Sequence, residues 1–206
     1  MNKAVAWTCA ALALQVAAVG WLVWRYERIV LNGTEVRIKC QAYDPYDPLR
    51  GRYLRMTVRE ECTNILFNVK EKHLWRGMAE KAFGKLVKMP DGSGLYRVDA
   101  IARNPADDGL WVKLESLSIE DALGYGDKKP DETYDEFRVR CDKAGFKAIV
   151  SFPDKLFLNE KIAPEAEKLL RKESDSAVAV YRAYEGRMVL TDIEIGGKPI
   201  LSVVKE

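Results

Sequence analysis

The uncharged stretch AVAWTCAALALQVAAVGWLVW, residues 4–24, determines how this chain is organised. Lys3 precedes it and Arg25 follows it, and no charged residue interrupts its 21 positions. As an α-helix rising about 1.5 Å per residue, it would measure roughly 31 Å, close to the hydrocarbon thickness of a bilayer. Aromatic residues suited to the membrane–water interface gather at its C-terminal end: Trp21, Trp24 and Tyr26. The sequence therefore predicts one N-terminal transmembrane helix, with residues 4–24 in contact with membrane lipid.

Two other interpretations of this stretch are open. Small residues at Ala17 and Ala18 could form the cleavage site of a signal peptide, but the apolar run exceeds the usual length of about 7–15 residues. A buried core helix normally carries a polar stripe, and this run has none. A retained span is favoured, so residues 1–31 are assigned to the membrane anchor and its helical extension. The turn residues Asn32-Gly33 are expected to end the helix.

The sidedness of the span depends on few charges. Lys3 and the amino terminus stand on one side, and Arg25 and Arg28 stand on the other, so the count of positive charges is almost tied. A short tail can stay in the cytoplasm while a long domain is exported largely regardless of its charge. The expected location is the cell membrane, with a single pass and the domain on the extracytoplasmic (periplasmic) side.

The remaining 182 residues have the composition of a water-facing domain. They carry 32 basic and 31 acidic side chains, and the whole chain has a net charge of +2 without a block of like charge. A nucleic-acid binder needs a concentrated basic face, so no nucleic-acid partner is expected. His73 is the single histidine, which excludes a multi-histidine metal site. Neither a metal nor a cofactor is predicted.

Alternation of apolar and polar residues predicts that residues 32–206 form a mainly β domain, a β-rich α+β fold. Residues 35–43 show this pattern with an apolar residue at every second position: Val36, Ile38, Cys40 and Ala42. Turns rich in glycine, proline and aspartate separate further predicted strands at 53–61, 86–89, 95–103, 110–117, 178–184, 188–195 and 199–204. The rest of the prediction comprises an exposed loop at 124–136 and two helices, at 71–83 (closed by Gly84) and 164–172.

Four cysteines leave the redox state of the domain open. Cys9 lies in the apolar stretch, and the domain holds three more: Cys40, Cys62 and Cys141. Cys40 and Cys141 each continue the apolar face of a predicted strand, which favours buried and unreactive thiols. One disulfide is possible if the domain is exported, but no Cys-x-x-Cys motif points to redox chemistry or to zinc.

The densest group of polar and aromatic residues is YDPYDPLRGRY, residues 43–53, between two predicted strands. A plain hairpin needs only about two to five residues there. Asp44 and Asp47 could simply close turns. Alternatively, the prolines hold a rigid loop that presents arginine and tyrosine, which give large contact areas with directional hydrogen bonds. The second interpretation predicts a binding site at Asp47, Arg50, Gly51, Arg52 and Tyr53.

The segment DPLRGRYLRM, residues 47–56, resembles the signature of the GDYXXLXY proteins, bacterial membrane-anchored proteins of unknown function. The family pattern reads D-P-x-x-L-x-G-D-Y-x-x-L-x-Y and follows an apolar N-terminal segment and a strand. This chain keeps the Asp-Pro pair, the leucine, Gly51 and Tyr53. It departs from the pattern at three positions, with Arg52 for the aspartate, Met56 for the leucine and Val58 for the final tyrosine.

Later segments, residues 91–114, 152–171 and 188–200, are similar to the middle hairpin, the late helix and the closing strand of the same family. Family members are often described beside multi-pass membrane proteins. The resemblance therefore implies a membrane-protein partner, and it implies no catalytic residue.

The sequence predicts a binding or scaffold domain rather than an enzyme. Two alternatives are an envelope hydrolase with an unrecognised active site and a domain that binds a lipid or cell-wall ligand. A carboxylate that converges with a hydroxyl or lysine in a deep pocket would favour the hydrolase, and a flat charged surface would favour the binding module. An open apolar cavity between sheet and helix would favour the ligand carrier.

Overall fold

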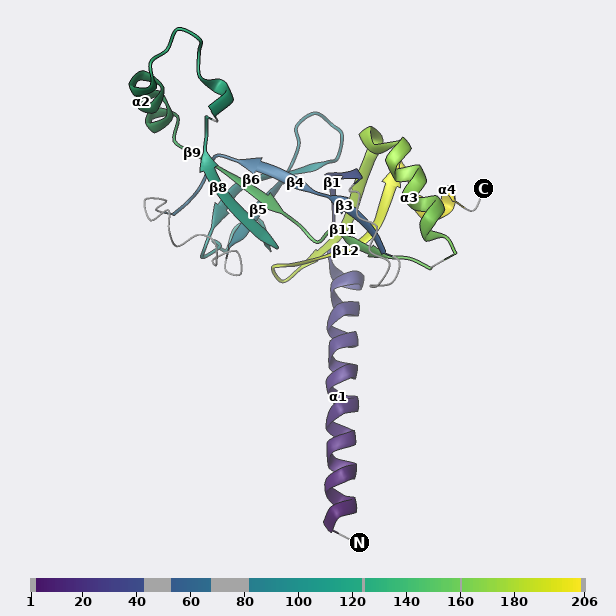
Figure 1. The fold of residues 1–206 in the computed structure, drawn as a ribbon. Coiled ribbons are helices and arrows are strands. Elements are labelled where there is room, and N and C mark those ends of the chain that lie inside the picture. Colours follow the sequence, from purple (N-terminus) through teal and green to yellow (C-terminus); the bar gives the residue numbers. More distant parts are fainter. Residues whose placement is uncertain (1–2, 43–52, 68–81, 124, 160, 205–206) are drawn as a thin grey trace.

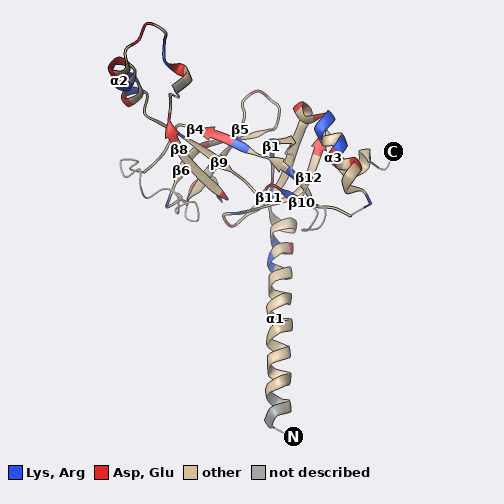
Figure 2. Ribbon diagram, viewed as in Figure 1, with Lys and Arg blue, Asp and Glu red and all other residues tan. Residues whose placement is uncertain are grey.

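α1 (Lys3–Asn32) projects from one side of a β-rich domain in the computed structural model (Figure 1). The structure describes residues 3–42, 53–67, 82–123, 125–159 and 161–204. α1 is long and apolar enough to cross a membrane, and its apolar window is not buried against the described parts of the domain. Figure 2 shows charged residues in its last turns, next to the domain. The core-helix alternative is therefore wrong.

The chain passes from α1 into the first strand through a single residue, Gly33. The Gly33 backbone N–H donates to the Ile29 carbonyl at 2.9 Å, and the Arg182 guanidinium donates to the Gly33 carbonyl at 3.3 Å. Ile29 is buried against the domain. Arg28 donates at 3.1 Å both to the Tyr184 hydroxyl and to the Glu185 carboxylate. The last turn of α1 is thus packed onto the domain without an intervening flexible linker.

Thirteen described strands form four small antiparallel sheets. The largest has the order β1 (Thr34–Lys39), β11 (Ala177–Tyr184), β12 (Arg187–Ile195), β13 (Lys198–Pro199). A second sheet has the order β10 (Lys155–Phe157), β3 (Tyr53–Thr57), β2 (Gln41–Ala42). The third has the order β4 (Arg59–Cys62), β9 (Phe146–Ser151), β8 (Ser116–Asp121), and the fourth β6 (Tyr96–Ala102), β5 (Phe83–Lys88), β7 (Leu110–Lys113).

One hydrophobic core joins these sheets. Its largest fully buried side chains come from four of the strands and from the segment between β9 and β10: Tyr181, Phe152, Ile38, Leu54, Met56 and Ile101. In β1 the inward residues alternate with outward ones, as the sequence pattern predicted. The mainly β fold behind a single apolar helix is therefore confirmed.

The described part of the domain has two longer helices. α3 (Ala163–Lys172) confirms the predicted helix at 164–172 and packs against β2 and β3, with Ala163, Ala166 and Leu170 filling the space. α2 (Tyr134–Ala144) begins inside the predicted loop 124–136, so that prediction is wrong for its last residues and for the short 3₁₀ turn at Tyr125–Asp127. Thr133 and Glu136 form a reciprocal capping box that starts α2.

Several predicted boundaries differ from the structure. The predicted strand 199–204 is wrong beyond Pro199, because α4 (Ile200–Val203) replaces it, with Ile200 buried in the core. The predicted strand 110–117 is divided into β7 and the start of β8. Most of the predicted helix 71–83 lies outside the described residues, but its predicted end is wrong. Phe83 and Gly84 belong to β5, where Gly84 pairs with Ile101 and Val112.

The cysteines have three different environments. Cys40 and Cys62 are buried, and burial raises the pKa of the Cys40 thiol to about 12, so this thiol stays protonated and unreactive. Cys141 lies half-buried on α2, which makes its predicted place on a strand wrong. All four cysteines are free thiols in this structure.

We expect α2 to loosen in acid. The Arg140 guanidinium donates to both Glu132 carboxylate oxygens, at 2.9 and 2.7 Å, and lowers the pKa of Glu132 from 4.5 to about 2. Because this pKa is depressed by folding, its stabilising effect is complete above pH 4.5 and is lost as the pH falls towards about 2. Amide chemical shifts of α2 should change across that window. Arg140→Gln should remove most of the change, and α2 signals that stay constant to pH 2 would contradict the assignment.

Candidate ligand-binding cleft

The structure describes little of the predicted binding site. Asp47, Arg50, Gly51 and Arg52 lie outside the described residues. Tyr53 is the first residue of β3, where its backbone pairs with Phe157 of β10. The sequence-based site therefore stays a prediction, but β3 leads directly from it to a cleft that the structure does describe.

This cleft forms at an interruption between two long strands. Arg55 of β3 pairs with Lys155 of β10, and Arg59 of β4 pairs with Ser151 of β9. The two positions are four residues apart along each strand, so both pairs share one register. The Met56 N–H donates to the Asp154 carbonyl at 3.1 Å in that same register. β3–β4 and β9–β10 are thus one antiparallel ladder, broken where Thr57-Val58 faces Phe152-Pro153.

Pro153 lies within the break, opposite Thr57 in the shared register. The Tyr181 hydroxyl donates to the Pro153 carbonyl at 2.9 Å, and burial raises the pKa of this phenol well above its ordinary value, which keeps the proton in place. Phe152 is buried below, and its ring centroid lies 6.3 Å from that of Tyr181. Contacts with buried core residues therefore stabilise the interruption.

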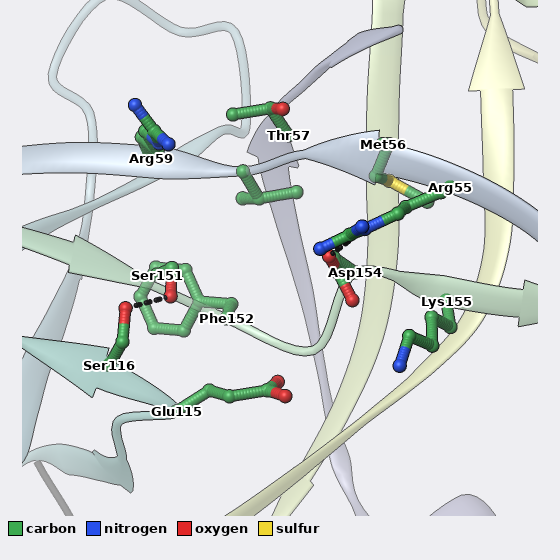
Figure 3. A pocket seen from close by; sticks show the side chains of 11 residues that line it. Arg55, Met56, Thr57, Arg59, Glu115, Ser116, Ser151, Phe152, Asp154 and Lys155 are labelled. Carbon is green, nitrogen blue, oxygen red and sulfur yellow. Dashed lines mark hydrogen bonds and ion pairs between the residues drawn. The ribbon is translucent and has the colours of Figure 1, made fainter. Parts of the chain in front are cut away.

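Above this break lies a cleft of about 330 Å³ (Figure 3). Along β3 and β4 the buried side chains Leu54, Met56 and Val58 alternate with side chains on the opposite face. That opposite face supplies the first wall: Arg55, Thr57 and Arg59. The second wall comes from the facing strand and the start of β8: Ser151, Asp154, Lys155, Glu115 and Ser116.

We call this hollow the ladder-break cleft. Its ion pairs and hydroxyls determine what it can bind. Arg55 Nε lies 2.8 Å from Asp154 Oδ2, with side chains 36% and 23% exposed. Ion pairs at such exposure contribute only about 0–1 kcal/mol, so a charged ligand can compete for either partner. Arg59 and Lys155 add positive charge, and Glu115 extends into the cleft below Asp154 (Figure 3). The arrangement suits a polar ligand that carries both anionic and hydrogen-bonding groups.

Two described contacts engage the serines and the aspartate of the cleft. The Ser116 and Ser151 hydroxyls hydrogen-bond each other, and the Asp154 carboxylate is engaged by Arg55. A serine nucleophile needs a base within hydrogen-bond reach, and neither contact provides one. Among the residues that the structure describes, no group of three His, Cys, Asp or Glu side chains could hold a metal ion.

The sequence pattern indicates one wall of this cleft. The alternation in residues 53–61 places Arg55, Thr57 and Arg59 on one face of a strand, and that signal was available. The second wall was not recognised, because β8, β9 and β10 carry weak alternation. In addition, the pairing of β9 with β4 and of β10 with β3 joins residues far apart in the chain.

Two of the three departures from the family pattern lie in the hydrophobic core. Met56 and Val58, which depart from the resembled pattern, are both buried and keep an apolar side chain in the core. Comparison with curated proteins and with solved structures gives no match. The family model described as GDYXXLXY protein matches residues 15–193, which is most of the chain. On this match, the chain belongs to the GDYXXLXY protein family.

Proposed function

We propose that this chain is a single-pass membrane protein whose domain lies on the extracytoplasmic side. There it acts as a binding or scaffold module, together with a partner protein in the same membrane. The ladder-break cleft and the preceding residues Asp47, Arg50, Gly51, Arg52 and Tyr53 form the contact surface. No catalytic step and no cofactor is part of this proposal.

The junction between α1 and the domain is the observation that carries this proposal. A flexible linker would be sufficient to tether a domain to a bilayer, but here β1 begins one residue after Gly33 and the last turn of α1 packs on β11 and β12. The guanidinium carbon of Arg28 lies 4.9 Å from the ring centroid of Trp24 on α1 and 5.4 Å from that of Tyr184 on β11. Arg28 therefore joins the helix to the hairpin of β11 and β12. A domain fixed to its span presents the cleft at a constant height, as a partner in the same membrane requires.

One observation favours the hydrolase as a second candidate. Ser151, Glu115 and Lys155 line the same cleft, so a hydroxyl, a carboxylate and an amine share one space. A fluorophosphonate probe distinguishes the candidates. A hydrolase with a serine nucleophile would be labelled at Ser151 or Ser116, whereas the binding module would not be labelled.

A photo-crosslinking experiment tests the contact surface. We expect p-benzoyl-phenylalanine in place of Arg59, at the edge of the cleft, to crosslink a membrane protein in intact cells. The same replacement of Arg138, exposed on α2 at the far end of the domain (Figure 1), is the matched control. Combining the Arg59 probe with Arg50→Ala and Tyr53→Ala should reduce the crosslink several-fold. Equal crosslinking from both positions, or no effect of the two alanines, would contradict the proposal.

The sidedness has its own test. Protease added to intact spheroplasts should digest the domain without prior lysis, and alkaline carbonate should leave the full-length chain in the membrane pellet. Digestion only after lysis would place the domain on the cytoplasmic side, and release by carbonate would remove the anchor from the proposal.

A further inference from the structure

A second hollow lies beside α1, and we call it the stem groove. It has a volume of about 510 Å³, and its apolar lining comes from α1, from β12 and from the segments that follow β7 and β9: Ile29, Leu114, Pro153, Met188 and Val189. Lys113, Arg187 and Glu115 complete it. Leu114 and Pro153 directly precede Glu115 and Asp154 of the ladder-break cleft, so the two hollows share a wall.

The stem groove lies at a defined height along α1. Ile29 is five residues beyond Trp24, the end of the uncharged stretch, which corresponds to about 7–8 Å along a helix. A bilayer has roughly 30 Å of hydrocarbon within a total of about 40–45 Å, which leaves about 5–7 Å for each headgroup layer. With residues 4–24 in the hydrocarbon, as proposed above, the groove lies at the outer edge of the lipid headgroups.

Two cations meet at the rim of the groove. The Lys113 N–H donates to the Gly186 carbonyl at 2.8 Å, which brings Lys113 next to Arg187 from a distant part of the chain. Both side chains are exposed, and neither forms an ion pair with a described residue. The Glu115 side chain extends into the ladder-break cleft (Figure 3). Adjacent like charges repel each other, and a bound anion offsets that repulsion.

We propose that the stem groove binds the headgroup of an anionic phospholipid. The phosphodiester contacts Lys113 and Arg187, and the glycerol carbons of the headgroup region pack against Ile29 and Met188. This inference rests on the proposed membrane anchor, because only that anchor brings lipid to the groove. Bound lipid would then lie against the wall that the groove shares with the ladder-break cleft.

Native mass spectrometry of the full-length protein in detergent micelles tests the site. Phosphatidylglycerol and phosphatidylcholine are added separately, and we expect one phosphatidylglycerol to be retained preferentially. Lys113→Gln with Arg187→Gln should reduce that retention about tenfold, since each cation near a lipid surface contributes attraction to anionic headgroups. Arg138→Gln with Lys143→Gln removes the same charge from α2 and should leave retention unchanged.

Three outcomes would overturn the inference. These are equal retention of the two lipids, an equal loss in the α2 control, and displacement of the lipid by soluble glycerol phosphate, which would identify a site for free phosphate. Failure of the anchor is detected separately, because carbonate extraction reports on α1 and lipid retention in micelles reports on the groove.

Discussion

Gly33→Ala is expected to lower the free energy of unfolding by about 1–3 kcal/mol, because a methyl group has no room where α1 joins the domain. A Cβ at position 33 would lie 2.4 Å from the Ile29 carbonyl oxygen, 3.0 Å from Arg182 Cβ and 3.1 Å from the Ala183 backbone nitrogen. Two of these three atoms are backbone, so relief of the overlap requires the backbone to shift, both in the last turn of α1 at Ile29 and between α1 and β11 at Ala183. The substitution should therefore weaken the junction on which the proposed function depends.

Thermal unfolding of the full-length protein in detergent measures the loss of stability. Amide exchange measures the weakening of the junction. The N–H of residue 33, bonded to Ile29 in the native protein, should exchange faster in Gly33→Ala. Gly20→Ala is the matched control, since nothing lies within 4 Å of a Cβ there. If both variants unfold at the native temperature and residue 33 stays protected, the junction tolerates a side chain and is not rigid.

The features that the sequence predicts correctly have strong local signals. An uncharged run of 21 residues can hardly form anything but an apolar helix, and α1 follows it. The hairpin of β11 and β12 follows from alternation on both sides of Glu185-Gly186, where both residues adopt positive φ. In α3, proline in the first turn and basic residues in the last agree with the helix dipole.

The features that the sequence predicts poorly depend on tertiary structure. α2 buries only Phe137, so it lacks an apolar stripe, and its available signal was the spacing Thr133-x-x-Glu136 of a capping box. Gly84 is the second residue of the central strand β5 rather than a helix end, because Leu114 and Val98 pack where a side chain would be.

The ladder-break cleft illustrates this limit most clearly. It exists because two strand pairs share a register across Pro153, and a register between segments about a hundred residues apart has no local signature. The sequence shows the residues of one wall but not which strand faces them.

Phe152→Ala should destabilise the domain more than Gly33→Ala does, with a loss of about 3–5 kcal/mol in the free energy of unfolding. The ring is 1% exposed and packs beneath the interruption, beside Tyr181, whose hydroxyl holds the Pro153 carbonyl. Removing the ring leaves a cavity beneath the break, which the surrounding side chains can fill only in part. The same substitution should change the shape of the cleft floor.

Phe157→Ala provides the matched control, because it removes the same ring from a side chain that is 78% exposed on the neighbouring strand β10. It should cost less than about 1 kcal/mol in urea unfolding followed by circular dichroism. Phe152→Leu, which keeps most of the buried volume, should recover part of the loss. Similar losses for Phe152→Ala and Phe157→Ala would mean that the core does not hold the break. The cleft would then be a loosely packed surface feature, with no fixed shape for a ligand to recognise.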